Sequence, residues 1–281
     1  MKIKMNNALD YCKFRDKFRQ FLETIDLNRY REEFKDKKYV EQDLPDDVVN
    51  IILNSLYENY LEKKKFLSFD TWFEEVWDKL VDLKEFNEFL WYYWHERLGK
   101  DENWDKWFKE GLKARLYRTW TAVLTQFDFT YTIICVIEEK RYNFSISASS
   151  KLNKKGIDLR LSISDHDIDF QVYKISERKE AREIRKGIVR VPYPVISRKE
   201  LIKKINSPYV RKKIVYENVL KIFDKYYEEL DNGFIVFKKE LAEEILKRLP
   251  LIQELERFVE ELANCLRGKE CMLLELKVYL D

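Results

Sequence analysis

The stretch GIDLRLSISDHDIDFQVYK, residues 156–174, decides the fold class that we predict for this chain. Apolar and polar residues alternate along residues 157–163 and again along residues 168–175, a pattern typical of half-buried β-strands. The residues between these two runs, SDHD at 164–167, are typical of a turn. The stretch therefore predicts a β-hairpin.

Helical and strand-like patterns surround this hairpin and together predict a mixed α/β fold. Apolar residues recur at helical spacing in residues 9–25, 45–60, 70–98 and 103–126. Further strands are expected at residues 129–137, 142–149, 188–191 and 234–237. Further helices are expected at residues 177–186, 198–206 and 209–230. We predict a helical region over residues 1–127, an α/β core over residues 128–240 and a C-terminal helical segment over residues 241–281.

The bulk composition of the 281 residues excludes some classes of protein. A hydrophobic fraction of 45% is enough to form a sizeable core. The sequence contains no run of eighteen apolar residues, so we predict no membrane span. The N-terminus lacks the apolar stretch of a signal peptide, so we expect a cytoplasmic protein. The net charge of +2 does not itself indicate that the protein binds nucleic acid. Charged residues make up 37% of the chain, a fraction that is consistent either with a thermophilic protein or with an AT-rich genome.

The cysteines and histidines give little indication of a metal site. The four cysteines are scattered without a paired CxxC spacing, and the chain has only two histidines. In a cytoplasmic protein this pattern predicts free thiols and neither a disulfide framework nor a zinc site.

The hairpin carries residues suited to phosphodiester hydrolysis. That reaction needs a hard cation held by oxygen ligands and a positive charge near the attacked phosphate. Asp158 at the start of one strand, with Gln171 and Lys174 on its partner, meets these needs in the layout of a PD-(D/E)xK nuclease core. On a regular strand Gln171 and Lys174 face opposite sides, so a bulge near residues 172–173 is required if both are to reach one metal ion. The alternative is a pair of solvated strand residues.

Each of the other candidate residues also has a non-functional interpretation. Asp169 and Glu110 are possible additional acids, although each is also typical of a surface charge, and His166 is a possible base or a solvated turn residue. The aromatic residues of 70–98 indicate interhelical core or, less simply, a surface that stacks on DNA bases. The predicted helix at 177–186 is either a phosphate-binding face or an exposed helix with internal ion pairs.

Several segments resemble the TaqI family of restriction endonucleases, in the same order as in that family and over roughly residues 10–245. They are YVEQDLP at 39–45, GLKARLYRT at 111–119, TQF at 125–127, GID at 156–158, QVYK at 171–174, VPY at 191–193 and NGF at 232–234.

The resemblance implies a type II endonuclease of the PD-(D/E)xK superfamily that cuts duplex DNA at the palindrome TCGA with Mg²⁺. It also implies a homodimer and a cognate DNA methyltransferase in the same system. Asp158 matches the family's GID aspartate, and Lys174 matches a basic position of its neighbouring strand. Asn153 stands where the family has another acid, and Tyr173 replaces a lysine. We therefore expect Asp158, Gln171 and Asn153 at the metal and Lys174 at the phosphate.

Basic residues near these motifs are the candidates for DNA binding. They are Arg115, Arg118, Arg178, Arg182, Arg185, Lys203, Lys204 and Lys212. Two other functions stay open at this point: a DNA-binding protein of the same fold that cuts poorly, indicated by Asn153 and Tyr173, and an unrelated helical interaction protein.

Overall fold

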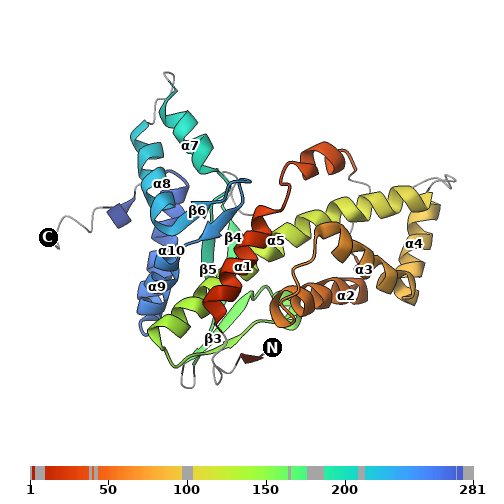
Figure 1. The fold of residues 1–281 in the computed structure, drawn as a ribbon, viewed down its shortest axis with the longest axis horizontal. Coiled ribbons are helices and arrows are strands. Elements are labelled where there is room, and N and C mark those ends of the chain that lie inside the picture. Colours follow the sequence, from red (N-terminus) through yellow and green to blue (C-terminus); the bar gives the residue numbers. More distant parts are fainter. Residues whose placement is uncertain are drawn as a thin grey trace. The chain divides into compact units, whose positions relative to one another are not determined.

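The computed structural model describes two compact units. Its described residues are 2–3, 10–37, 40, 44–96, 104–163, 166–175, 187–207, 213–269 and 271–274. One unit is Thr24–Phe127; the other combines Met1–Glu23 with Asp128–Asp281 (Figure 1). Residues 1–23 and 241–281, which we expected to lie outside the α/β core, belong to the same unit as the sheet.

The unit Thr24–Phe127 is helical, as the apolar spacing predicted. Its aromatic residues form much of its core: Trp72 and Phe73 of α3 are fully buried, as is Phe86 of α4. Trp91 of α4 remains 59% exposed, so the aromatic stripe is core only in part. The elements are η1 (Tyr30–Phe34), α2 (Asp46–Leu56), η2 (Tyr57–Glu62), α3 (Phe69–Val81), α4 (Lys84–Glu96) and the first part of α5 (Trp104–Lys140).

Helix α5 extends through the segment where we expected a strand, so the strand predicted at residues 129–137 is wrong. Every residue from Leu124 to Ile137 except Gln126 is buried. A helix buried on all sides shows no amphipathic period, and its β-branched and aromatic residues then imitate a strand. The segment Lys106–Lys140 also has the length and composition of a membrane span, but 83% of its most apolar window is buried inside the protein.

A five-stranded mixed sheet dominates the other unit. The strand order is β1-β2-β3-β4-β5, antiparallel except for the parallel pair β4 and β5. The predicted hairpin is confirmed as β3 and β4, but His166 and Asp167, expected in its turn, belong to β4 and pair with β3. The strands are β1 (Lys2–Ile3), β2 (Ser145–Ser147), β3 (Leu159–Ile163), β4 (His166–Lys174) and β5 (Ile188–Tyr193).

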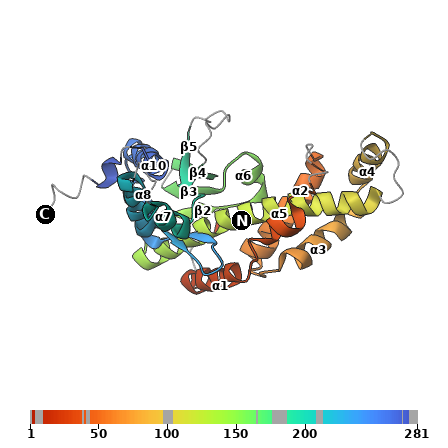
Figure 2. The ribbon, with the colours of Figure 1, turned by 90° about the horizontal axis from the view of Figure 1, so that it is seen from above.

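The second half of α5 lies between the sheet and helix α1 (Tyr11–Glu23), as Figure 2 shows. Phe129 packs against Phe170 of β4 on one side, and Tyr131 packs against Phe18 of α1 on the other. This arrangement buries both apolar surfaces of the helix.

The remaining elements cover the sheet's β5 side and form a second, small ladder. Helix α10 packs against β5 and α8, and strands β6 and β7 pair as an antiparallel hairpin across the turn at Asn232 and Gly233. These elements are α7 (Arg198–Ile205), α8 (Lys213–Tyr226), β6 (Tyr227–Glu229), β7 (Ile235–Phe237), α9 (Lys239–Arg248), α10 (Ile252–Leu266) and η3 (Met272–Leu274).

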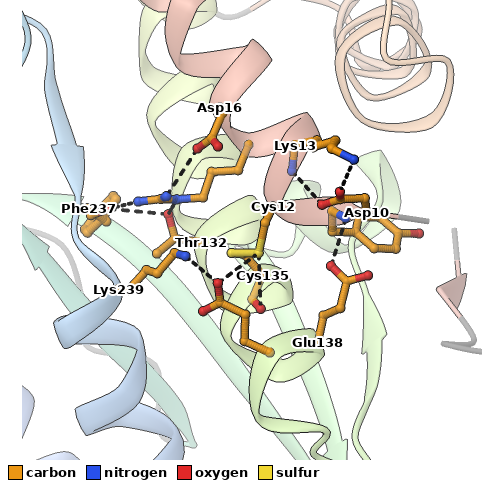
Figure 3. The surroundings of a disulfide bond; sticks show 12 residues. Asp10, Cys12, Lys13, Asp16, Thr132, Cys135, Glu138, Phe237 and Lys239 are labelled. Atoms are coloured by element: carbon orange, nitrogen blue, oxygen red, sulfur yellow. Dashed lines mark hydrogen bonds and ion pairs between the residues drawn. A yellow bond between two sulfur atoms is a disulfide. The ribbon is translucent and has the colours of Figure 1, made fainter. Parts of the chain in front are cut away.

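Two disulfides correct our expectation of free thiols. Cys12 of α1 is bonded to Cys135 of α5, and Cys265 of α10 is bonded to Cys271. Spacing in the sequence did not indicate the first pair because its cysteines are 123 residues apart and meet only when α1 packs on α5 (Figure 3).

A buried ionic network joins α1, α5 and β7. The carboxylate of Asp128, fully buried in α5, accepts a hydrogen bond of 2.7 Å from the backbone N–H of Phe237. Its other oxygen lies 3.2 Å from the Arg19 guanidinium, which also donates to the Phe237 carbonyl. Arg15 adds a 3.1 Å hydrogen bond to Thr132. The network satisfies polar groups that the packing of these elements removes from water.

Asp128→Asn should therefore destabilise the protein by roughly 2 kcal/mol, because it removes the fully buried charge that binds Arg19 and leaves that guanidinium with only the half-exposed Glu228 as an ion-pair partner. Urea denaturation measures the loss, with Asp231→Asn in the exposed turn as the control. Equal stabilities of the two variants would contradict the role of the network.

Candidate functional site

The candidate site begins at a short helix whose end fixes the position of Asp158. Helix α6 (Ser150–Lys154) starts at Ser149, whose side chain accepts a hydrogen bond from the N–H of Leu152. It ends with two bonds, from the N–H of Gly156 to the Asn153 carbonyl and from the N–H of Ile157 to the Leu152 carbonyl. This is a Schellman motif, and Gly156 occupies its left-handed position with a φ of 74°. The glycine thus turns the chain so that Asp158 lies immediately before β3.

The carboxylate of Asp158 is buried and hydrogen-bonded on both oxygens. The Asn153 amide donates to one oxygen at 3.0 Å, and the backbone N–H of Val172 donates to the other at 2.7 Å. Asp158 is only 3% exposed. Its side chain therefore joins α6 to β4 just beyond the last β3–β4 ladder pair, Leu159 with Phe170.

Burial raises the pKa of Asp158 to about 7, and the hydrogen bond from Val172 lowers it only in part. Among the described residues, no cationic side chain contributes to this pKa. A buried carboxylate without a compensating positive charge is costly in its ionised form.

Lys174 ends β4, two residues beyond Val172, whose backbone N–H binds the Asp158 carboxylate. Side chains two residues apart project from the same face of a strand about 7 Å apart, so Lys174 shares the face of Val172. The Lys174 side chain is exposed, yet nearby protein atoms partly desolvate its ammonium and lower its pKa. Like Asp158, it has no opposite charge among the causes of its pKa shift.

Gln171 projects from the opposite face of β4. The β4–β5 ladder runs from Asp169 with Ile188 to Lys174 with Tyr193 without an inserted residue. The bulge that would turn Gln171 and Lys174 toward one metal ion is therefore not formed. On the Gln171 face, the guanidinium of Arg190 lies 4.2 Å from the centre of the Tyr173 ring.

The atoms around Asp158 fit a hard divalent cation. Its own carboxylate and the side-chain oxygen of Asn153 are the kinds of ligand that Mg²⁺ prefers, and Mg²⁺ usually keeps several waters. The uncompensated buried charge is an electrostatic reason for a cation to bind there. Cys12, Cys135 and Glu139 lie close enough to hold a metal, but this pair of cysteines forms a disulfide.

The other acids considered from the sequence are engaged elsewhere or exposed. Asp169 forms an ion pair with Arg160 at 2.6 Å, and Glu110 lies 3.3 Å from Lys37 in the helical unit. His166 is an exposed residue of β4. None of the three contacts Asp158.

The predicted DNA-binding residues fall into separate places. Arg115 and Arg118 lie on α5 in the helical unit; Arg115 donates to the Val40 carbonyl at 3.4 Å, and Arg118 lies over the Tyr30 ring. Lys203 and Lys204 lie on α7 in the unit that contains the sheet. Four further candidates lie outside the described residues: Arg178, Arg182, Arg185 and Lys212.

Sequence reasoning missed two features of this site. One is the backbone N–H of Val172 as a partner of Asp158, which no residue type could have indicated. The other is the set of exposed lysines Lys151, Lys154 and Lys155, which surround Asn153. Their signal was present in the sequence SKLNKKGID at 150–158.

Comparison with known proteins defines the class as restriction endonucleases. The family model described as TaqI restriction endonuclease matches residues 15–249. The type II restriction enzyme TthHB8I of Thermus thermophilus is 31% identical over 268 residues, which cover 89% of this chain and 90% of that enzyme. The type II restriction enzyme TaqI of Thermus aquaticus is 29% identical over 245 residues, 81% and 85% of the two chains. The chain belongs to the TaqI restriction endonuclease family. No solved structure matches it.

The raised pKa of Asp158 predicts a pH-dependent loss of stability in metal-free protein. Between about pH 4 and pH 7 the folded state holds a proton that the unfolded state releases, so stability falls as the pH rises through this range. Asp158→Asn removes the titration. Its stability relative to the wild type should therefore increase from pH 5 to pH 8, by on the order of 2 to 4 kcal/mol.

Urea denaturation at the two pH values, without divalent metal, measures this difference. Asp231→Asn, an exposed acid of the same unit, should show nearly the same difference at both pH values. A pH-independent effect of Asp158→Asn would show that its carboxyl group titrates normally.

Proposed function

We propose that this protein is a Mg²⁺-dependent type II restriction endonuclease that hydrolyses phosphodiester bonds of duplex DNA within the sequence TCGA. The observation that carries the proposal is the uncompensated, buried carboxylate of Asp158 beside Asn153, with Lys174 on the adjacent strand, in a chain of this family.

The topology of the sheet supports a PD-(D/E)xK type of nuclease core. Strands β2, β3 and β4 are antiparallel, β5 joins β4 in parallel, and α5 packs against the sheet through Phe129 and Phe170. Asp158 lies immediately before β3, and Lys174 ends β4. This is the placement that we expected from residues 156–174.

Each residue of the site has a distinct role in the proposed reaction. Asp158 and Asn153 provide the protein's ligands for Mg²⁺; when bound, the ion supplies Lewis-acid activation of water and stabilisation of charge on the phosphorane. Asn153 also holds the Asp158 carboxylate in place through its amide hydrogen bond. Lys174 is exposed, so its ammonium is available to orient the attacking water and to stabilise the negative charge that develops on the phosphate.

Gln171 has a smaller part in this proposal than the sequence indicated. Since Gln171 and Lys174 project from opposite faces of β4, they do not both reach one metal ion unless β4 rearranges on binding DNA. We therefore assign the chemistry to Asp158, Asn153 and Lys174.

Electrostatics support DNA binding near the sheet. Residues 198–226, which include α7 and α8, carry nine basic and three acidic residues, a net charge of +6, whereas the whole chain carries only +2. A segment of such charge suits the phosphate backbone. We propose that Lys203, Lys204 and Lys212 contact phosphates there, with Arg178, Arg182 and Arg185 of the preceding segment and Arg115 and Arg118 of α5 as further contacts.

The proposed target also implies an assembly. A palindrome has two-fold symmetry, so two copies of the chain would present one site to each strand. We propose a cytoplasmic homodimer that acts beside a methyltransferase which protects the same sequence.

A second candidate function is a DNA-binding protein that cuts poorly. The sequence indicates it through Asn153, which offers a neutral oxygen where the family pattern has an acid and so weakens the attraction for a cation, but the relatives are type II restriction enzymes and do not favour it.

Wild-type protein with Mg²⁺ should linearise a supercoiled plasmid that contains TCGA sites. Lys174→Ala should lower the single-turnover cleavage rate by about 100-fold or more, because it removes a cation that stabilises the transition state. Agarose gels measure the rate, and Lys269→Ala, an exposed lysine of the same unit, is the control.

Two results would redirect the proposal. If wild type and Lys174→Ala are equally inert with several metals and temperatures but both shift a TCGA duplex, the protein binds without cutting. If the sequenced ends lie outside TCGA, the specificity is different.

A further inference from the structure

The surface beside Asp158 is basic in a way that the proposed roles do not use. Residues 140–157 contain five basic and no acidic residues: Lys140, Arg141, Lys151, Lys154 and Lys155. The last three belong to α6 or its C-cap, and all three are exposed. We call them the α6 lysines.

Helix α6 holds these lysines in a fixed relation to the catalytic acid. The Asn153 side chain, in the same turn of helix, donates to the Asp158 carboxylate at 3.0 Å. The Schellman bonds at Gly156 and Ile157 leave no flexible linker between the helix and Asp158. Any phosphate that the α6 lysines bind is therefore positioned relative to the cutting site.

The spacing of the α6 lysines matches the spacing of charge on one DNA strand. Lys151 and Lys154 are three residues apart and lie on neighbouring positions of the helix surface. From Lys151 to Lys155 the helix rises by about 6 Å, and each DNA strand carries one charge for about every 3.4 Å of its axis. The three ammonium groups can therefore contact two or three successive phosphates.

The charges around the site give a reason for such a contact. Asp158 itself, and Asp167 and Asp169 on β4, place negative charge on the hairpin. Arg160 pairs with Asp167 and Asp169 at 2.9 and 2.6 Å, so its charge is already used. Lys174 and the proposed Mg²⁺ act at the phosphate that is attacked, and a further positive charge at close range would hold the neighbouring phosphates of the strand.

We propose that the α6 lysines form a phosphate clamp, which binds the backbone of the DNA strand being cut next to the bond that faces Asp158. This inference rests on the proposed function, because it assumes that duplex DNA is the substrate of the Asp158 site. The clamp contributes affinity and position and reads no base.

The variant K151A/K154A/K155A tests the clamp. Fluorescence anisotropy measures its binding to a TCGA duplex between 50 and 200 mM salt, with Ca²⁺ in place of Mg²⁺ to prevent cutting. We expect at least a 10-fold loss of affinity in 50 mM salt. The slope of log K against log salt should become shallower by two to three, because about 0.9 is lost for each phosphate contact.

A matched variant separates the clamp from a general effect of charge. K63A/K79A/K84A removes three exposed lysines from the helical unit and changes the net charge equally. It should bind with nearly the wild-type affinity and slope. The variant K151R/K154R/K155R, which keeps the charges, should restore most of the affinity. Thermal melting tests whether each variant is folded. If a triple variant is not folded, the single variants Lys151→Ala and Lys154→Ala take its place.

Each outcome has a distinct meaning. An unchanged slope in K151A/K154A/K155A, or an equal loss in K63A/K79A/K84A, overturns the clamp while wild-type cutting leaves the proposed function intact. If the wild type neither binds nor cuts the duplex, the proposed function fails and the clamp fails with it.

Discussion

The unit that contains the sheet depends on the carboxylate of Asp128, buried in the middle of α5. It binds the Phe237 N–H and the Arg19 guanidinium, so one side chain connects α5 to both β7 and α1. The Cys12–Cys135 disulfide joins α1 and α5 a second time. With α1 fixed to one side of α5, the opposite side is left to pack against β4 through Phe129 and Phe170. The position of β4, the strand that carries Lys174, therefore depends on the contacts of Asp128.

In the candidate site, by contrast, the charged groups lack partners of opposite charge among the described groups that set their pKa values. Desolvation raises the pKa of Asp158 and lowers the pKa of Lys174. A fold that satisfies Asp128 so fully leaves these two charges uncompensated. A cation and a phosphate are the two species that would compensate them, which are also the two species that a metal-dependent nuclease binds.

Much of this could be predicted from the sequence, and the failures have physical causes. The β3–β4 hairpin was readable because one face of each strand is buried and the other is not. The second half of α5 was not, because burial on every side removes the periodicity on which such a prediction depends. Asp158 and Lys174 were predicted as site residues. The sequence left open whether a bulge turns Gln171 and Lys174 to one side, and the unbroken β4–β5 ladder shows that they face opposite sides. The Cys12–Cys135 pair joins segments 123 residues apart, and the Val172 N–H is a backbone group that every residue except proline has, so no local pattern of residue types indicates either contact.

The central claim, that the buried charge of Asp158 is completed by a cation, can be tested without DNA. Thermal or urea unfolding at pH 8 should show that Mg²⁺ stabilises the wild type, by about 2.7 kcal/mol when the ion is at 100 times its dissociation constant. Lys174→Ala should retain this stabilisation, since its ammonium is no ligand, and Asp158→Asn should lose most of it. Equal stabilisation of Asp158→Asn and wild type by Mg²⁺ would place the metal elsewhere and contradict the claim.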